Sequence, residues 1–275
     1  MANALHGSRR PLRSTRTYGL ARAPWAWAVG GSLLGVIAAL LLNAPASWLA
    51  WGVYKATGQR VVLDDVRGTI WNASAQLTLS GGPGSLDEKT MQGRLRWQAL
   101  PILQGLRVSV QADCCMQQAW HVRLLPGWSG LRLSLADHSS NWPAELMTGL
   151  GTPWNTIQAQ GSLRLRSQGL ELQWAAGRLS VNGQLQLDAI DMSSRLSTLR
   201  PMGSYRLVLQ GGATPTLALS TLGGALQLSG QGQWVGERLR FNGQASASAG
   251  FESVLSNLLN IIGRRQGERS IIQLG

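Results

Sequence analysis

Two hydrophobic patterns divide the chain: a continuous apolar run near the N-terminus and an alternating pattern beyond residue 58. The run covers residues 25–42, WAWAVGGSLLGVIAALLL, and contains no charged residue. As a helix rising about 1.5 Å per residue it would extend about 27 Å, close to the thickness of the hydrocarbon core of a bilayer. The pattern therefore predicts one transmembrane helix over residues 25–42.

Basic and aromatic residues predict how this helix is oriented. Residues 1–24 contain five arginines and no acid, whereas the first basic residue after the run is Lys55. The positive-inside rule then makes 1–24 a basic cytoplasmic tail, 43–58 a juxtamembrane segment and 59–275 a domain outside the cytoplasm. Aromatic rings that settle at the two membrane interfaces are expected at Trp25, Trp27, Trp48, Trp51 and Tyr54.

A cleaved signal peptide is the alternative for the same segment. Ala44-Pro45-Ala46 resembles a small-x-small cleavage site. The apolar run is longer than the usual 7–15 residues of a signal peptide, which favours an uncleaved anchor.

Beyond Gly58, apolar and polar residues alternate with the period of two that marks a strand with one packed and one wet face, as at Leu131, Leu133 and Leu135. Glycine-rich turn signals separate these runs, and Asn182-Gly183 and Asn242-Gly243 predict hairpin turns. The pattern predicts a mainly β domain over 59–275, an antiparallel curved sheet of sandwich or half-barrel type. The segments GRLSVNGQLQL and ERLRFNGQASA, 60 residues apart, resemble each other, which leaves two related sheet halves as an option.

Residues 251–262, FESVLSNLLNII, have the spacing of an amphipathic helix that ends at Gly263. Such a helix either caps the open end of the sheet or docks on a partner. A further short helix is expected from Pro143 to Thr148.

In the segment RGTIWNASAQLTLSG, Gly68 is expected to form a turn before a strand over 69–79, and Trp71 is expected to be a contact residue for a partner. The candidate interaction residues are Trp71, Phe251, Leu255, Leu258, Arg264 and Arg265.

Charge and cysteine content narrow the classes of function. The formal net charge is +12, but beyond the tail the basic residues are scattered and often alternate with leucine. A nucleic-acid partner is therefore not expected. Cys114 and Cys115 are adjacent, and two free thiols are expected because neighbouring Cα atoms lie closer than an unstrained disulfide allows. A vicinal disulfide that acts as a redox switch is the alternative.

The sequence contains no recognisable catalytic, cofactor or metal motif, and no enzyme activity is expected. Asp137-His138-Ser139 is interpreted as a polar turn, because triad members are brought together by the fold rather than by adjacency. The pairs Asp64-Asp65 and Asp188 with Asp191 are expected in solvated turns at strand ends. No nucleophile elbow, zinc spacing or P-loop is present.

Six segments in order carry a resemblance to a known family: NAPASWLA, RGTIWNASAQL, GLGTPWNTIQAQGSLRL, SSRLSTLRPMGSYRL, LSTLGGALQLSGQGQW and LSNLLNIIGRRQGERSIIQLG. Together they resemble the type II secretion system protein N family of proteobacterial inner membranes. The resemblance implies a single-pass inner-membrane component with a periplasmic β domain and no catalytic activity or cofactor. It also implies that the partners are other inner-membrane platform proteins of the apparatus and, further out, the outer-membrane secretin.

Two functions remain open on the sequence. The first is a scaffold subunit that holds other secretion proteins during export of folded proteins across the outer membrane. The second is a lipid- or lipoprotein-handling protein, because a curved sheet with a leucine-lined face could hold acyl chains.

Overall fold

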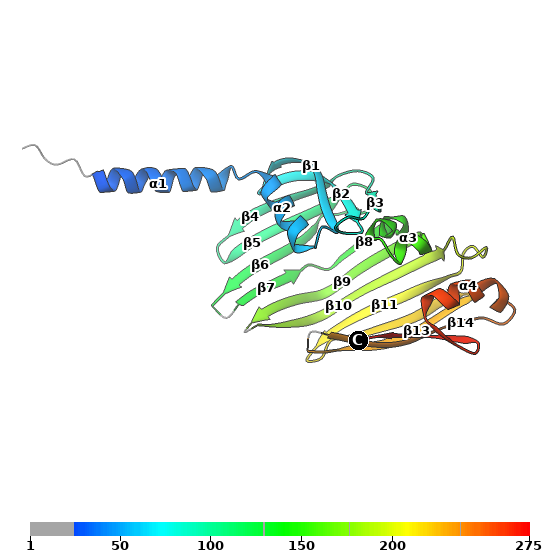
Figure 1. Cartoon of the computed structure of the whole chain (residues 1–275). Coiled ribbons are helices and arrows are strands. Elements are labelled where there is room, and N and C mark those ends of the chain that lie inside the picture. Colours follow the sequence, from blue (N-terminus) through cyan, green and yellow to red (C-terminus); the bar gives the residue numbers. More distant parts are fainter. Residues whose placement is uncertain (1–24, 129, 176, 237) are drawn as a thin grey trace, which may run out of the picture. The chain divides into compact units, whose positions relative to one another are not determined.

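The computed structural model describes residues 25–128, 130–175, 177–236 and 238–275, which belong to two compact units divided after Leu42. The described part of the first unit is the helix α1 (Trp25–Leu42; Figure 1), which has the predicted bounds. Within the described residues it is the one helix long and apolar enough to cross a membrane. The predicted basic tail, residues 1–24, lies outside the described residues.

The second unit, Asn43–Gly275, is mainly β, as the alternating pattern predicts. Its helices are α2 (Ala46–Ala56), the 3-10 helix η1 (Ala144–Leu150), α3 (Trp154–Ile157) and α4 (Glu252–Ile262). Its strands are β1 (Val61–Thr69), β2 (Asn72–Ser80), β3 (Glu88–Thr90), β4 (Leu95–Ile102), β5 (Gly105–Ala112), β6 (Trp120–Gly127), β7 (Gly130–Leu135), β8 (His138–Pro143), β9 (Gln160–Ala175), β10 (Arg178–Ser193), β11 (Gly203–Gly212), β12 (Thr216–Gly224), β13 (Leu226–Val235), β14 (Arg238–Ala247), β15 (Arg264–Gln266) and β16 (Arg269–Leu274).

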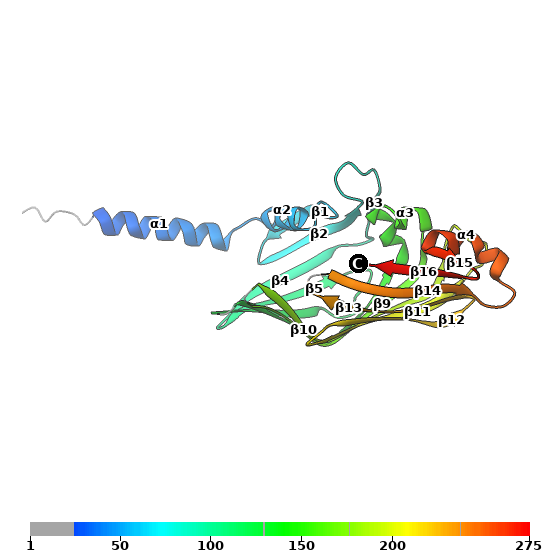
Figure 2. The same ribbon diagram turned by 60° about the horizontal axis from the view of Figure 1, so that its bottom comes forward.

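All these strands join one antiparallel sheet that does not close on itself. The order is β1-β2-β4-β5-β6-β7-β9-β10-β11-β12-β13-β14-β16-β15, with β3 paired to β2 and β8 paired to β9. The sheet curls around the side on which α3 and α4 lie (Figure 2). The two similar segments form β10 and β14 of this continuous sheet. The curved, open antiparallel sheet predicted from the sequence is confirmed.

The register puts apolar side chains on the inner face and polar ones on the outer face. Leu165 of β9, Leu187 of β10 and Leu207 of β11 lie side by side, and the next partner is Leu219 of β12. One position away, Arg166 pairs with Gln186 on the opposite face. Alternation along each strand therefore produces one apolar face that continues across neighbouring strands.

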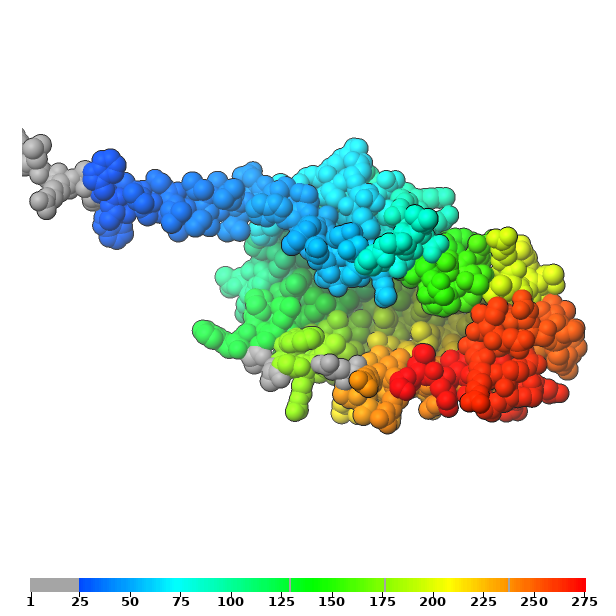
Figure 3. Space-filling model, viewed as in Figure 1, coloured from blue at the N-terminus to red at the C-terminus, as the bar shows by residue number. Residues whose placement is uncertain are grey.

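Helices pack on parts of this inner face. α4 buries Leu255, Leu258 and Leu259 against Tyr205 and Leu226, and thus caps the sheet as one of the two interpretations predicted. Other clusters form around Leu146 of η1 and around Ala46 of α2. Between α2 and the C-terminal strands the space-filling surface is hollowed, with strands from the middle of the chain as its floor (Figure 3). We call this hollow the trough.

Both Asn-Gly pairs lie within strands, so the prediction that they form hairpin turns is wrong. Gly183 lies in β10 at a shift of register, with φ of 83°, and the chain continues in the same direction. Gly243 lies in the middle of β14, opposite Gly230, and the Phe241 ring covers both glycines. The local signal was overridden because long paired strands supply more hydrogen bonds than an early turn would.

The first hairpin turns two residues later than predicted. β1 continues through Gly68 to Thr69, and the turn is made by Ile70 and Trp71. Gly68 is needed for a different reason than a turn: its φ is 101°, and a side chain there would overlap the carbonyl oxygen of Asn72. The short helix predicted over 143–148 is confirmed as η1, which starts one residue later, at Ala144.

Candidate interaction surfaces

The turn that holds Trp71 is integrated into the sheet. The Trp71 carbonyl oxygen accepts a hydrogen bond of 2.7 Å from the Ala99 N–H, and the neighbouring Ile70 carbonyl accepts one of 3.2 Å from the Trp97 indole. The Trp71 side chain is half-buried. These contacts give the turn a structural role in joining β1 and β2 to β4, and a partner of Trp71 stays a prediction.

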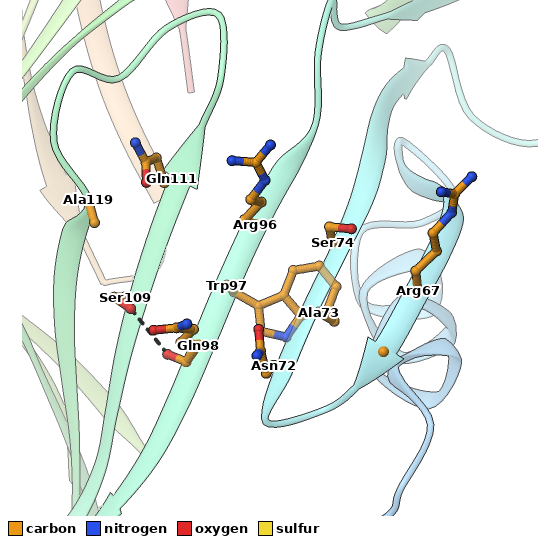
Figure 4. A pocket seen from close by; sticks show the side chains of 11 residues that line it. Arg67, Asn72, Ala73, Ser74, Arg96, Trp97, Gln98, Ser109, Gln111 and Ala119 are labelled. Atoms are coloured by element: carbon orange, nitrogen blue, oxygen red, sulfur yellow. Dashed lines mark hydrogen bonds between the residues drawn. The ribbon is translucent and has the colours of Figure 1, made fainter.

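A shallow hollow of about 470 Å³ lies next to this turn (Figure 4). Most of its lining residues have polar side chains and come from β1, β2, β4 and β5, with the Trp97 ring and Ala119 among the apolar ones. Arg67 and Arg96 belong to its lining, but they already form ion pairs, with Asp65 at 2.9 Å and with Asp113 at 3.1 Å. The hollow therefore has polar donors and no group arranged for covalent chemistry.

The predicted residues of the C-terminal helix separate into buried and exposed sets. Leu255 and Leu258 are fully buried in the core, so within the folded domain they have no surface to offer a partner. This corrects the expectation that they contact another protein. Phe251 is partly exposed, and Arg264 and Arg265 are exposed on the edge strand β15, where Arg265 Nε donates to the Gly267 carbonyl at 2.7 Å.

The aromatic residues predicted for the membrane interfaces lie on helices. Trp25 and Trp27 are exposed in the first turn of α1, and Trp48 and Trp51 are exposed on α2. The ammonium of Lys55 lies 5.9 Å from the centre of the Trp51 ring. Tyr54, on the same helix, is half-buried. α2 thus presents two large indole rings to its surroundings directly after α1 in the sequence.

Asp188 is part of an ion-pair network on the outer face and not of a solvated turn, which corrects that expectation. Its oxygens accept hydrogen bonds from Arg206 Nε at 2.7 Å and Nη2 at 3.1 Å, and from the Gln186 amide at 3.0 Å. Arg166 lies 3.8 Å away. The side chain is almost completely buried, and the Arg206 hydrogen bonds hold the pKa of the carboxyl below its usual value. These partners are structural, because no nucleophile lies among them.

Asp65 also lies inside a strand, although it was expected in a turn at a strand end. It occupies a register shift in β1 with φ of 44°. Arg67 and Arg94 both form ion pairs with its carboxylate and keep the pKa of Asp65 below its usual value. Arg94 donates as well to the Asp65 carbonyl at 2.6 Å, so the arginine fixes the irregular backbone from two sides.

Cys114 and Cys115 form a disulfide with each other, so the expectation of two free thiols is wrong and the alternative pairing holds. They lie in the connection between β5 and β6, with Cys115 buried beside Met116 and Cys114 exposed. The adjacency of the two cysteines in the sequence did not decide whether they form a disulfide. The disulfide depends on how the backbone turns at these two residues.

His138 is not in a turn but begins β8 on the inner face. Its ring stacks on Trp120, with centroids 5.4 Å apart, and burial lowers the pKa of the imidazole. Asp137 instead accepts a hydrogen bond from the Gly169 N–H at 2.7 Å. Among the described residues, no three His, Cys, Asp or Glu side chains come together as metal ligands would.

The alternating pattern implied a concave apolar face but did not show where on the sheet the trough lies. The strands in the middle of the chain, β9 to β12, carry on their inner face leucines that are half-buried and lie outside the buried clusters under the helices: Leu165, Leu185, Leu187, Leu207, Leu209 and Leu217. The alternation of each strand is visible in the sequence. The curvature that turns these strands into one concave surface is not.

Comparison with known proteins gives the family. No curated protein and no solved structure matches the chain. The family model described as type II secretion system (T2SS), protein N, matches residues 59–272, which includes all the strands except the C-terminal end of β16. This match covers most of the chain and agrees with the resemblance of its separate segments. The chain belongs to the type II secretion system protein N family.

Proposed function

We propose that the protein is a non-catalytic scaffold subunit of the type II secretion apparatus, anchored in the inner membrane by α1 with its β domain in the periplasm. The family match is the observation that carries this proposal. The apolar helix α1 is consistent with a single-pass inner-membrane protein. The arginines before it support a cytoplasmic N-terminus through the positive-inside rule.

The surfaces available for a scaffold are the outer face and the exposed edges of the sheet. The edge strand β15 exposes Arg264 and Arg265, and an edge has backbone groups that can pair with another strand. We expect platform proteins of the apparatus, and the outer-membrane secretin, to bind through such surfaces. The apolar candidates are Phe251, directly before α4, and Trp71, in the β1–β2 turn at the other edge of the sheet.

In-cell photocrosslinking tests this proposal. A photoreactive amino acid at Arg264 or Phe251 should form adducts with secretion-platform proteins, which mass spectrometry identifies. The matched control is the same probe at Leu222, an exposed residue at the end of β12. Adducts that contain no secretion protein at any position would count against the scaffold function.

Topology is tested separately. Leu86 is fully exposed in the loop between β2 and β3. A Leu86→Cys chain in which Cys114 and Cys115 are both alanine should react with an impermeant maleimide in cells with a permeabilised outer membrane. Labelling only after lysis would place the β domain in the cytoplasm and contradict the proposed orientation.

A lipid- or lipoprotein-handling function is the second candidate, and the trough favours it. Its leucine floor is long enough, across four paired strands, to contact an acyl chain along its length. Native mass spectrometry of the full chain would detect a retained lipid. Leu207→Gln should remove bound lipid, whereas Val208→Gln, on the opposite face, should not. If the purified chain retains no lipid and neither substitution changes this, the lipid-handling function is rejected and the scaffold function remains.

A further inference from the structure

Most hairpin turns of the sheet lie at one of its two ends, together with Ala44 and Pro45 at the start of the β domain. We call this end the hairpin end. The Ile70 N–H donates to the Ala44 carbonyl at 2.9 Å, and Pro45 bridges to Thr69, so the chain joins the sheet beside the β1–β2 turn. Because the paired strands are antiparallel, the β4–β5, β6–β7, β9–β10, β11–β12 and β13–β14 connections lie at this same end. η1, α3 and α4 follow strands that finish at the opposite end, the helix end.

Large exposed apolar side chains concentrate at the hairpin end. Leu103 and Trp128, at the tips of the β4–β5 and β6–β7 connections, are completely exposed. Trp174 pairs with Leu131 on one side and with Leu179 on the other, so these three exposed side chains form a strip across β7, β9 and β10. The same end also exposes Leu100, Val235 and Leu274.

The helix end exposes fewer and mostly smaller side chains of this kind, and no tryptophan among the described residues: Leu86, Leu222, Phe251, Val254 and Ile261. Water-exposed tryptophan and leucine at successive turn tips are unfavourable for a domain that is surrounded by water on all sides. Their concentration at one end indicates that something apolar covers it. A shift of register at Gly183 separates this strip from the inner-face leucines that lie nearer the helix end.

Two observations point to a lipid bilayer as the covering surface. The first is continuity along the chain: Asn43 directly follows α1, and Ala44 and Pro45 are fixed at the hairpin end. An anchored α1 therefore tethers this end, and not the helix end, to the membrane. The first turns of α2, which follow Pro45, expose Trp48 and Trp51 there as well.

The second observation is composition. In the sequence, residues 100–107, 125–132, 173–180 and 233–240, which make the β4–β5, β6–β7, β9–β10 and β13–β14 connections with the adjoining strand ends, contain one acid, Glu237, and five arginines: Arg107, Arg132, Arg178, Arg238 and Arg240. Tryptophan with basic residues is the combination that binds at the boundary between headgroups and acyl chains, where indole rings and guanidinium groups both find favourable surroundings. A protein partner selected by shape would not require this combination.

We propose that the hairpin end of the β domain docks on the bilayer in which α1 is anchored, with Leu103 and Trp128 at the lipid interface. This rests on the proposed anchoring by α1 but not on any secretion partner. In this orientation the strands run away from the membrane surface, and the helix end is the part of the β domain farthest from the lipid.

Local fluorescence probes in the full chain test this docking. A single cysteine replaces Leu103 at the hairpin end or Leu86 at the helix end, two leucines that are both completely exposed. In both chains Cys114 and Cys115 are replaced by alanine, so that only the introduced cysteine is labelled with the NBD fluorophore. Each labelled chain is then reconstituted in phosphatidylethanolamine–phosphatidylglycerol liposomes. NBD at position 103 should emit at shorter wavelength and be quenched by doxyl-labelled lipids several-fold more than NBD at position 86.

Equal quenching at the two positions, or stronger quenching at 86, would overturn the proposal. A chain with its native cysteines provides an independent measurement, because replacing the pair could disturb the fold. There, brominated lipids should quench tryptophan fluorescence, and Trp128→Phe should reduce the quenched fraction more than Trp154→Phe in α3. The liposomes contain no other protein, so failure of the crosslinking experiment with successful quenching would reject only the scaffold function.

Discussion

Replacing the buried carboxylate of Asp188 by an amide should destabilise the β domain by about 2 kcal/mol at pH 7. Asp188→Asn keeps the shape of the side chain but turns an amide N–H₂ toward donors that include Arg206. Hydrogen bonds to a charged group contribute about 1.5–3 kcal/mol each, and loss of a partner from a fully buried pair costs about 3–5 kcal/mol. The lower part of these ranges applies because the Arg206 and Arg166 side chains are 37% and 41% exposed and can be hydrated again.

The pH dependence provides an internal check on this reasoning. Since folding lowers the pKa of Asp188, its contribution is complete above the unfolded pKa of about 4 and is lost as the pH falls through the lower, folded pKa. The difference between the wild-type chain and Asp188→Asn should therefore be largest at neutral pH. It should shrink below pH about 4, where the aspartate also becomes neutral.

Thermal unfolding of the detergent-solubilised full chain, followed by tryptophan fluorescence from pH 7 to pH 2.5, measures this difference. For a domain of this size 2 kcal/mol corresponds to a decrease of about 4–8 °C in Tm. Asp64→Asn is the control, because Asp64 is exposed and forms no ion pair with any of the described residues. The reasoning would be refuted by a decrease under about 1 °C at pH 7, or by a decrease that persists unchanged at pH 2.5.

Three further substitutions and one control probe the packing. Leu258→Ala should destabilise the domain by about 2–5 kcal/mol, because it leaves a cavity under α4. Its control, Ile261→Ala on the exposed side of that helix, should change stability by under about 0.5 kcal/mol. Urea unfolding of the two variants measures both values. Phe241→Ala should cost about 3–5 kcal/mol, since its ring covers neighbouring glycines, and a loss below about 1 kcal/mol in the same assay would contradict this packing. Gly183→Ala should cost about 1–3 kcal/mol, because φ is positive and a methyl group would overlap the Gly169 carbonyl; unchanged Tm would show that the bulge is absent.

The candidate surfaces were only partly predictable. Leu255 and Leu258 fit the apolar stripe of an amphipathic helix, and the pattern alone gives the same stripe to a helix that caps a core and to one that binds a partner. Only the packing of α4 on Tyr205 and Leu226 distinguished them. The hairpin end was not predicted at all, because Leu103, Trp128 and Trp174 are far apart in the sequence and each is unremarkable by itself.

The sequence by itself determined the apolar helix over 25–42, the mainly β second unit, the C-terminal helix and, through six short segments, the family. These follow from local periodicity and composition, which are properties of neighbouring residues. The tertiary structure decided that Asn182-Gly183 and Asn242-Gly243 continue strands, that Asp188 is buried, and that the leucines share one concave face. Those outcomes depend on cross-strand register and sheet curvature, which bring together residues that local pattern cannot connect.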